Sequence, residues 1–393
     1  MESDASVMRS ARPPARKRTG AAPAGDFTFG IEEEYFLADA ETLQMATETP
    51  DDLFGAVAAG MPGRISREFL QAQAEVATQP QASAAKARAE LIGLRQTAAA
   101  AAAQHGLAIM ACGTHPTGRW PEVVQTPKRR YDVVMDQLQM IGQRNLLCGM
   151  HVHVELPDPR RRVDVMTRML PYIPLFLALS TSSPFWQSHL TGLKGYRLAA
   201  YDELPRTGLP ELFRSAREYE RYVAAMVKAG AIQDASHIWW AIRISPKYPT
   251  LELRAPDCCT RVRDALAIAS LFRCLVRRLY RDPEHNAGID VVARSIAVEN
   301  KWRAQRYGAE TTFVTAEGPL GVGEFLERAL ELTVDDAEAL NCAVEISNCR
   351  AILAEGTSAD VQLSRFFERE PQDGSEGALR AVNQWIAAAT LET

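Results

Sequence analysis

No CxxC pair occurs among the seven cysteines of the 393-residue sequence, and seven is an odd number. Disulfide-rich secreted domains and zinc knuckles both depend on cysteines paired at short, regular spacing. The sequence therefore fits neither class. Unpaired thiols are typical of a reducing compartment, so we expect a cytoplasmic protein.

Long apolar runs and an excess of positive charge are also missing. The most apolar segment, MLPYIPLFLALS (169–180), contains Pro171 and Pro174 and is shorter than the roughly 20 residues that span a bilayer. The net charge is −5 and the isoelectric point is about 5.9. These values argue against a membrane or a nucleic acid as the main partner. An anionic substrate would need a local metal ion or an arginine cluster.

Several catalytic motifs are absent as well. The sequence contains no P-loop, no kinase glycine loop, no GxSxG nucleophile elbow and no HExxH zinc motif. A nucleotide, if one binds, must therefore be held by metal ions on a sheet and not by a glycine-rich loop.

The N-terminal 26 residues are rich in Arg, Ala, Pro and Gly and lack the apolar centre of a signal peptide. We predict a disordered leader over 1–26; a targeting peptide is the weaker alternative because Glu2 and Asp4 open the chain. Residues 27–393 are expected to form a single catalytic domain with a helical C-terminal part. Alternation, helix formers and turn residues predict strands over 29–37, 63–80, 107–116, 148–158, 237–246 and 249–257, and helices over 84–104, 131–147, 161–180, 261–280 and most of the chain from 290.

The stretch FGIEEEYFL (29–37) places three consecutive glutamates inside a strand pattern. Side chains alternate between the faces of a strand, so Glu32 and Glu34 share one face and Glu33 lies on the other. Two neighbouring carboxylates repel each other, and burying them is costly without a cation nearby. A solvated edge strand that uses charge against aggregation is the alternative.

Acidic and imidazole side chains recur at alternating positions on three further strands. They are Glu75 in the second strand, His151 and His153 in CGMHVHVELPD, and Glu252 in PTLELRAPD. Oxygen ligands with one or two imidazoles suit Mg²⁺ or Mn²⁺ better than zinc. Two alternatives stay open: surface histidines, and a structural ion pair between Glu252 and Arg254.

Arginines accompany these acids. Arg243 and Arg254 lie on the last two strands, and Arg303 and Arg306 lie three apart in NKWRAQRYG. Forked guanidinium donors match phosphate and carboxylate, and carboxylate-bound Mg²⁺ facing arginines suits phosphoryl transfer. The long segment 181–210 contains several aromatic residues, and we expect part of it to cover the mouth of the site.

The combination of GIEEEYFL, AEVAT, CGMHVHVELPD, LALSTSSPFW, IWWAIRISPKYPTLELRAPD and NKWRAQRYG resembles the carboxylate-amine ligase family, also called glutamate–cysteine ligase type 2. This resemblance implies an α+β fold like that of glutamine synthetase. Its mostly antiparallel sheet is curved into an active-site funnel, with helices on the outer face.

The resemblance further implies an ATP-dependent ligase that joins a carboxylate to an amine through an acyl phosphate, with a weak activity that yields γ-glutamylcysteine, ADP and phosphate. It implies two or more Mg²⁺ or Mn²⁺ ions and small amino-acid substrates, and it leaves a homodimer open. Carried onto this sequence, it assigns Glu32, Glu34, Glu75, Glu252 and His151 or His153 to metal, and Arg243, Arg254 and Arg303, with Arg306 beside it, to phosphate or carboxylate. A metal-dependent hydrolase of an amide or phosphate ester is the runner-up, and a catalytically silent binding protein is a third hypothesis.

Overall fold

The computed structural model describes residues 27–393, so the predicted leader over 1–26 lies outside the described residues. The strands are β1 (Phe29–Asp39), β2 (Ile65–Arg67), β3 (Gln73–Ala77), β4 (Leu107–Met110), β5 (Met150–Glu155), β6 (Phe185–Trp186), β7 (His189–Leu190), β8 (Ile242–Ile244), β9 (Thr250–Leu253), β10 (Thr312–Thr315) and β11 (Gly318–Gly321). The α-helices are α1 (Gly55–Gly60), α2 (Ala84–Ala103), α3 (Arg129–Leu138), α4 (Met140–Gln143), α5 (Arg162–Met169), α6 (Ile173–Ser180), α7 (Tyr196–Tyr201), α8 (Ala216–Lys228), α9 (Val262–Arg281), α10 (Val291–Tyr307), α11 (Val322–Leu332), α12 (Val334–Ala339), α13 (Ala343–Glu355) and α14 (Ser358–Thr390).

A seven-stranded sheet organises the described residues. Its order is β2-β3-β1-β5-β9-β8, and β4 pairs with the C-terminal end of β1. Each of these pairings is antiparallel. The predicted class, α+β with a mostly antiparallel curved sheet, is confirmed. The predicted hairpin of the strands around 237–246 and 249–257 is also present, as β8 and β9.

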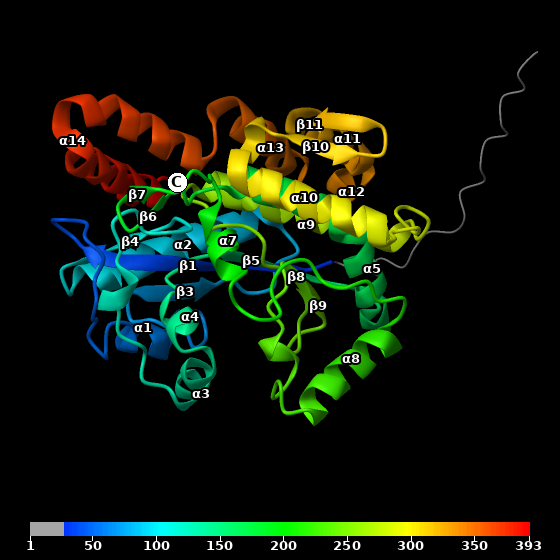
Figure 1. Ribbon diagram of the computed structural model, residues 1–393, viewed down its shortest axis with the longest axis horizontal. Helices are drawn as coiled ribbons and strands as arrows, with labels where there is room; N and C mark the ends of the chain where they lie inside the picture. The colour runs from blue at the N-terminus through cyan, green and yellow to red at the C-terminus, as the bar shows by residue number, and fades with distance from the viewer. Residues whose placement is uncertain (1–26) are drawn as a thin grey trace, which may run out of the picture.

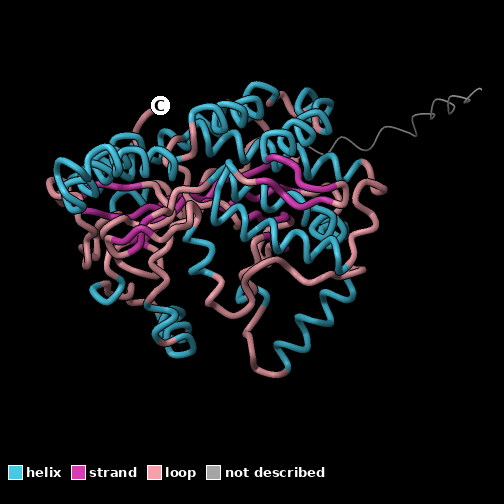
Figure 2. Tube along the Cα trace, turned by 45° about the horizontal axis from the view of Figure 1, so that its top comes forward, coloured by secondary structure: helices cyan, strands magenta, loops and turns pink. Residues whose placement is uncertain are grey.

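Helices cover one face of this sheet. Helix α2 packs on β1, β3 and β4, α9 packs on β5, and α14 packs on β4. Helices α10 to α13 form a further layer outside α6 and α9. On the opposite side, α3 and α8 project away from the helix layer, as both views show (Figures 1 and 2). The uncovered face of the sheet lies on the side of α3 and α8.

A buried ion pair ties the central strand to the helix layer. Glu33 is fully buried on β1, and its two carboxylate oxygens accept from Arg95 Nη2 at 2.7 Å and Arg95 Nε at 2.8 Å. The remaining Arg95 donors reach the carbonyl oxygens of Cys259, Thr260 and Thr390. All of these Arg95 donors therefore have partners, as a buried guanidinium requires. Through them the pair connects β1, α2, the start of α9 and the end of α14.

The apolar stretch at 159–180 lies in the core. This helical segment, Pro159–Ser180, is long and apolar enough by composition to cross a membrane, yet 83% of its apolar window is buried inside the protein. Leu175, Phe176 and Leu177 are each fully buried. The burial is typical of a core helix packed on other helices.

Three expectations about single elements are wrong in detail. The segment 63–80 is a hairpin of β2 and β3 and not one strand, because Leu70 turns into the core between them. The helix expected over 131–147 is broken into α3 and α4 at Gln139, which has a positive φ of 51°. The chain after 290 also contains the hairpin β10–β11, which sequence periodicity missed because its strands have four residues each.

Replacing Glu33 by Gln should lower the free energy of unfolding by about 3 kcal/mol, because Arg95 then stays buried without its counter-charge. Urea unfolding measures the change. The control is Glu122→Gln, which removes an exposed pair with Arg119 and should cost less than about 1 kcal/mol. Equal losses in the two variants would show that the buried pair of Glu33 and Arg95 contributes no more stability than an exposed pair.

Candidate active site

The register of the sheet brings the predicted residues together on its uncovered face. Glu34 lies opposite Glu75, and Glu32 lies opposite His151. On the next strands His153 lies opposite Glu252. Glu252 in turn lies opposite Arg243. Directly opposite side chains on one face are close neighbours, so five strands (β3, β1, β5, β9 and β8) build one continuous polar row.

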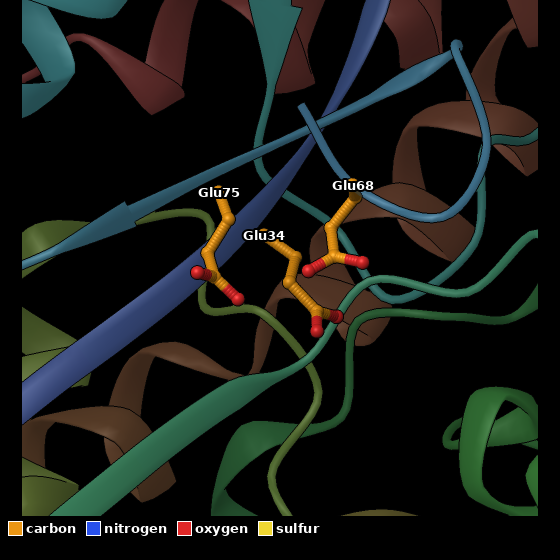
Figure 3. A group of neighbouring side chains, drawn as sticks. All are labelled: Glu34, Glu68 and Glu75. Atoms are coloured by element: carbon orange, nitrogen blue, oxygen red, sulfur yellow. The ribbon is translucent and has the colours of Figure 1, made fainter. Parts of the chain in front are cut away.

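Three carboxylates gather at one end of this row. An oxygen from each of Glu34, Glu68 and Glu75 lies within 4.8 Å of the other two (Figure 3). The backbone N–H of Gly149 donates to Glu34 Oε2 at 2.5 Å and fixes that side chain. Among residues 27–393, this is the one group of three ligand side chains whose atoms lie close enough together to hold a metal ion.

Sequence reasoning missed Glu68 as a member of this group. In a single strand, residues 68 and 75 would point to opposite faces because their separation is odd. The turn between β2 and β3 reverses the chain and returns Glu68 to the side of Glu75. Predicting a hairpin with its turn at residues 68–72 would have placed Glu68 on the same face as Glu75.

Burial and mutual repulsion perturb these acids strongly. Burial, followed by the charge of Glu68, raises the pKa of Glu34 to about 7. The same two causes, with Glu32 and Glu34 added, raise the pKa of Glu75 well above its usual range. A bound divalent cation would stabilise the ionised form of such buried, mutually repelling carboxylates. Because all the ligand atoms are oxygens, the site suits Mg²⁺ or Mn²⁺.

Glu32 and the two histidines form the middle of the row. Glu32 lies 3.5 Å from His151 Nδ1 and 3.5 Å from His153 Nε2. Burial alone would raise the pKa of Glu32, but its contacts with His151 and His153 hold that pKa well below its usual range. Burial and the nearby Arg254 lower the pKa of His151 to about 3, so His151 is a neutral imidazole. The Nε2 atoms of both histidines are buried without a hydrogen-bond partner, which fits two metal-ligating imidazoles.

Glu252 is engaged by arginines at the other end. Arg243 donates to its two oxygens at 2.8 and 2.9 Å, and Arg254 Nη1 donates to Oε1 at 2.5 Å. Burial opposes ionisation of Glu252, yet Arg254 and Arg243 outweigh it and hold its pKa well below the usual range. The ion pair that the sequence left open as an alternative is therefore present. A metal-ligating role of Glu252 stays a prediction.

The segment 181–210 contributes directly to this site. Arg197 and Tyr201 of α7 line the same cavity as the glutamates, which agrees with the expectation that part of the segment covers the site. Arg197 crosses the backbone at Gly149 so closely that a Cβ there would lie 2.0 Å from Nη2, and only glycine leaves this room. Arg254 Nη2 donates to the Tyr201 hydroxyl at 3.2 Å. The Nε atoms of Arg197 and Arg254 are buried without a partner, as expected of donors for an anionic ligand.

Arg303 and Arg306 lie apart from the carboxylate cluster, and their role at a phosphate or carboxylate stays a prediction. Both lie on α10 in the outer helix layer and do not line the cavity that holds the glutamates. Arg303 Nε donates to the Thr312 carbonyl oxygen at 2.6 Å, and Arg306 lies over the ring of Tyr307. The unpredicted hairpin β10–β11 engages Arg303, whereas Arg197, which was not among the predicted site residues, lines the cavity with the glutamates.

Three adjoining cavities surround the polar row. The central cavity of about 260 Å³ is lined by the carboxylate cluster and by Arg197, Arg243 and Arg254. A wider cavity of about 580 Å³ shares Glu32 with the central one and reaches Tyr248 and Pro249. A third, of about 210 Å³, shares Glu68 and Asn145 with the central cavity.

Comparison with known proteins identifies the family. The model of the glutamate–cysteine ligase family 2 (GCS2) matches residues 28–384. The chain belongs to this family. It is therefore an ATP-dependent ligase that forms a C–N bond, uses a divalent metal ion and acts on small amino-acid substrates, as the resemblance implied.

Relatives in several bacteria support this assignment. A protein of Bradyrhizobium sp. (strain ORS 278) is 57% identical over 96% of this chain and 91% of its own length. A protein of Rhodospirillum rubrum is 45% identical over 93% of this chain and 96% of its own length. Both carry names that assign them provisionally as glutamate–cysteine ligase 2.

Solved structures support the fold. Glutamate–cysteine ligase from Francisella tularensis, in complex with AMP, gives a TM-score of 0.67 at 13% identity, over 93% of this chain and 89% of that one. A bifunctional glutathione synthetase from Pasteurella multocida gives 0.68 at 17% identity, over 92% of this chain and 52% of that one. At these identities the likeness is one of fold alone.

For this GCS2 member we predict an unusual pH dependence of stability without metal. The pKa of Glu34 is about 7 in the folded protein and near 4.5 when unfolded, so the folded state holds the extra proton between those values. The free energy of unfolding should then fall as pH rises from about 4.5 to 7. Mn²⁺ should reverse this loss above pH 7, because it binds the ionised carboxylates. Urea unfolding with and without Mn²⁺ measures both effects.

The matched variants are Glu34→Gln and Glu41→Gln, the latter on an exposed turn. Glu34→Gln should flatten the pH dependence and reduce the stabilisation by Mn²⁺, whereas Glu41→Gln should behave like the wild type. An unchanged Mn²⁺ effect in Glu34→Gln would remove Glu34 from the metal site.

Proposed function

We propose that the protein joins the γ-carboxylate of glutamate to the amino group of a second amino acid through an acyl phosphate. A weak activity toward cysteine, giving γ-glutamylcysteine, belongs to this proposal. The observation that carries it is the arrangement of Glu34, Glu68 and Glu75 on one side of a cavity whose other walls bear three arginines. The family name and the names of the relatives agree with this reaction.

The proposed reaction has two displacements. A carboxylate oxygen of glutamate attacks the γ-phosphorus of ATP, and ADP leaves. The amino group of the second substrate then attacks the acyl carbon, a proton is lost from nitrogen, and phosphate leaves. Divalent cations supply charge neutralisation for the triphosphate in such reactions.

The residues of this chain have separate tasks in that scheme. The three carboxylates, with Glu32, His151 and His153 next to them, hold the cations. Arg197 and Arg254, whose Nε donors lack partners, bind the oxygens that carry charge during transfer. Glu252 keeps Arg243 and Arg254 oriented toward the cavity.

We assign the nucleoside to the wider cavity. It is less polar than the central one, and Pro62, Pro80, Tyr248 and Pro249 belong to its lining. Tyr248 is 45% exposed and packs edge-on against His153, with 5.9 Å between ring centroids, so it is positioned to contact a base. A nucleoside in this cavity would direct its phosphates toward Glu32, which lines both cavities. We also propose a cytoplasmic location, because all seven cysteines are buried free thiols.

Hydroxylamine trapping tests the reaction directly. With ATP, Mg²⁺ and glutamate, the wild type should form γ-glutamyl hydroxamate, and ADP should appear only when a carboxylate and an amine are both present. Glu34→Gln should lose at least about 10²-fold in turnover, since it removes one preorganised electrostatic partner, and higher Mg²⁺ should restore part of it. The control is again Glu41→Gln, which should keep the turnover of the wild type.

Two results would overturn the proposal. Phosphate release from ATP or a phosphate ester without an amine would indicate a hydrolase. Wild-type turnover of Glu34→Gln at about 1 to 5 mM Mg²⁺, below saturation of a weakened oxygen site, would exclude the assigned role of Glu34.

Tyr248→Ala tests the nucleoside assignment. Loss of base stacking should raise the KM for ATP about tenfold, with a smaller effect on the KM for glutamate, because stacking on an aromatic ring contributes about 1–3 kcal/mol. The control is Tyr307→Ala, which removes an exposed tyrosine on α10 that lies outside the three cavities. An unchanged KM for ATP in Tyr248→Ala would place the base elsewhere.

A further inference from the structure

The third cavity is a side pocket of the reaction site. Glu68, Asn145, Tyr201 and Trp239 line both this cavity and the central one, so the two communicate. Beyond them its wall is almost wholly apolar. We call it the acceptor pocket; the rest of its lining is Phe69, Tyr131, Val134, Leu138 and Leu204.

Helix α3 provides one wall of the acceptor pocket. Tyr131, Val134 and Leu138 are spaced three and four residues apart, so they share one face of the helix, and each is half-buried. Phe69 packs edge-on against Tyr131 with 5.2 Å between ring centroids. Leu204 and Trp239 close the other side from the segments after α7 and before β8.

The size of the acceptor pocket exceeds what cysteine needs. Its volume is about 210 Å³. An apolar cavity of about 150 Å³ already accommodates benzene. The CH₂SH group of cysteine would leave most of this space unfilled, whereas each further buried methylene favours binding by about fourfold.

The mouth of the acceptor pocket suits an amino group. The side-chain oxygen of Asn145 is buried without a hydrogen-bond partner, and Asn145 and Glu68 both line the acceptor pocket and the central cavity. Oxygens of both side chains can accept from an amine. Glu68 is the acidic residue of the lining, and its negative charge disfavours substrates with acidic side chains.

We propose that the preferred amine substrate is an amino acid with a large apolar side chain, of the size of leucine or phenylalanine, and that cysteine is a minor substrate. This inference rests on the proposed ligase function. The amino group lies at Asn145 and Glu68, and the side chain fills the space between α3 and Trp239. The weak cysteine activity then follows from an underfilled pocket.

The test compares amines in the complete reaction with ATP, Mg²⁺ and glutamate. Glycine, alanine, cysteine, leucine and phenylalanine are supplied singly, with ADP formation and product mass as readouts. The kcat/KM for leucine or phenylalanine should exceed that for cysteine at least about tenfold, the usual scale for one or more extra methylenes in an apolar pocket. Preference for cysteine by a working ligase would overturn the inference and leave the proposed function intact.

Two variants of one residue localise the effect. Val134→Phe fills the pocket and should lower the ratio of kcat/KM for leucine to that for cysteine at least about tenfold. Val134→Ala enlarges the pocket and should shift preference from leucine toward phenylalanine. The control, Met140→Phe, adds the same ring at an exposed position on α4 outside the pocket and should leave the ratio unchanged. Unaltered ratios in both Val134 variants would place the acceptor elsewhere.

A binding measurement separates failure of this inference from failure of the proposed function. Leucine or phenylalanine should raise the melting temperature of the wild type, and Val134→Phe should lose this shift while Met140→Phe keeps it. If no amine supports ADP formation but this pattern appears, the ligase proposal fails and the pocket assignment stands. If neither ADP formation nor the shift appears, both fail.

Discussion

Repulsion among carboxylates on one strand is the constraint on which the rest of this structure depends. Strand β1 carries three consecutive glutamates, and β3, β9 and the β2–β3 turn bring more acids beside them. Buried charge of one sign must be compensated nearby. Arg95 compensates Glu33 on the helix-covered face, and Arg243 and Arg254 compensate Glu252 on the open face. Among the described residues, no arginine or lysine forms an ion pair with Glu34, Glu68 or Glu75, and the raised pKa values of Glu34 and Glu75 reflect that deficit.

The two faces of the sheet therefore differ in role: one face packs against the helices, and the other forms the binding cavity. On the covered face, Arg95 links β1, the helices and the C-terminal segment, and these contacts hold the backbone of β1, which carries the site residues, in place. On the open face, arginines and carboxylates stand across a cavity, which favours binding of cations and phosphates together. A site of this kind needs no glycine-rich loop, which explains how the sequence lacks a P-loop.

Family membership and cavity shape answer different questions about the reaction. The GCS2 family defines the class of bond that forms, and we propose the polar row of the sheet as the place of that chemistry. In our proposal, the choice of amine depends on the apolar walls contributed by α3 and by residues near Trp239, which lie outside that row. Two members of one family can therefore share metal and phosphate chemistry and differ in acceptor.

From the sequence alone, the family resemblance implied the class of fold, and the alternation of side chains placed most of the polar row. Alternation with period two separates Glu33 from Glu32 and Glu34, and it places His151, His153 and Glu252 on consistent faces, because side-chain direction in a strand is a local property. Tertiary structure decided what local spacing does not encode. The β2–β3 turn brought in Glu68, α7 brought in Arg197 over Gly149, and the β10–β11 hairpin engaged Arg303 away from the site. Each of these outcomes depends on contacts between segments distant in the chain, so packing alone selected which charged residues meet.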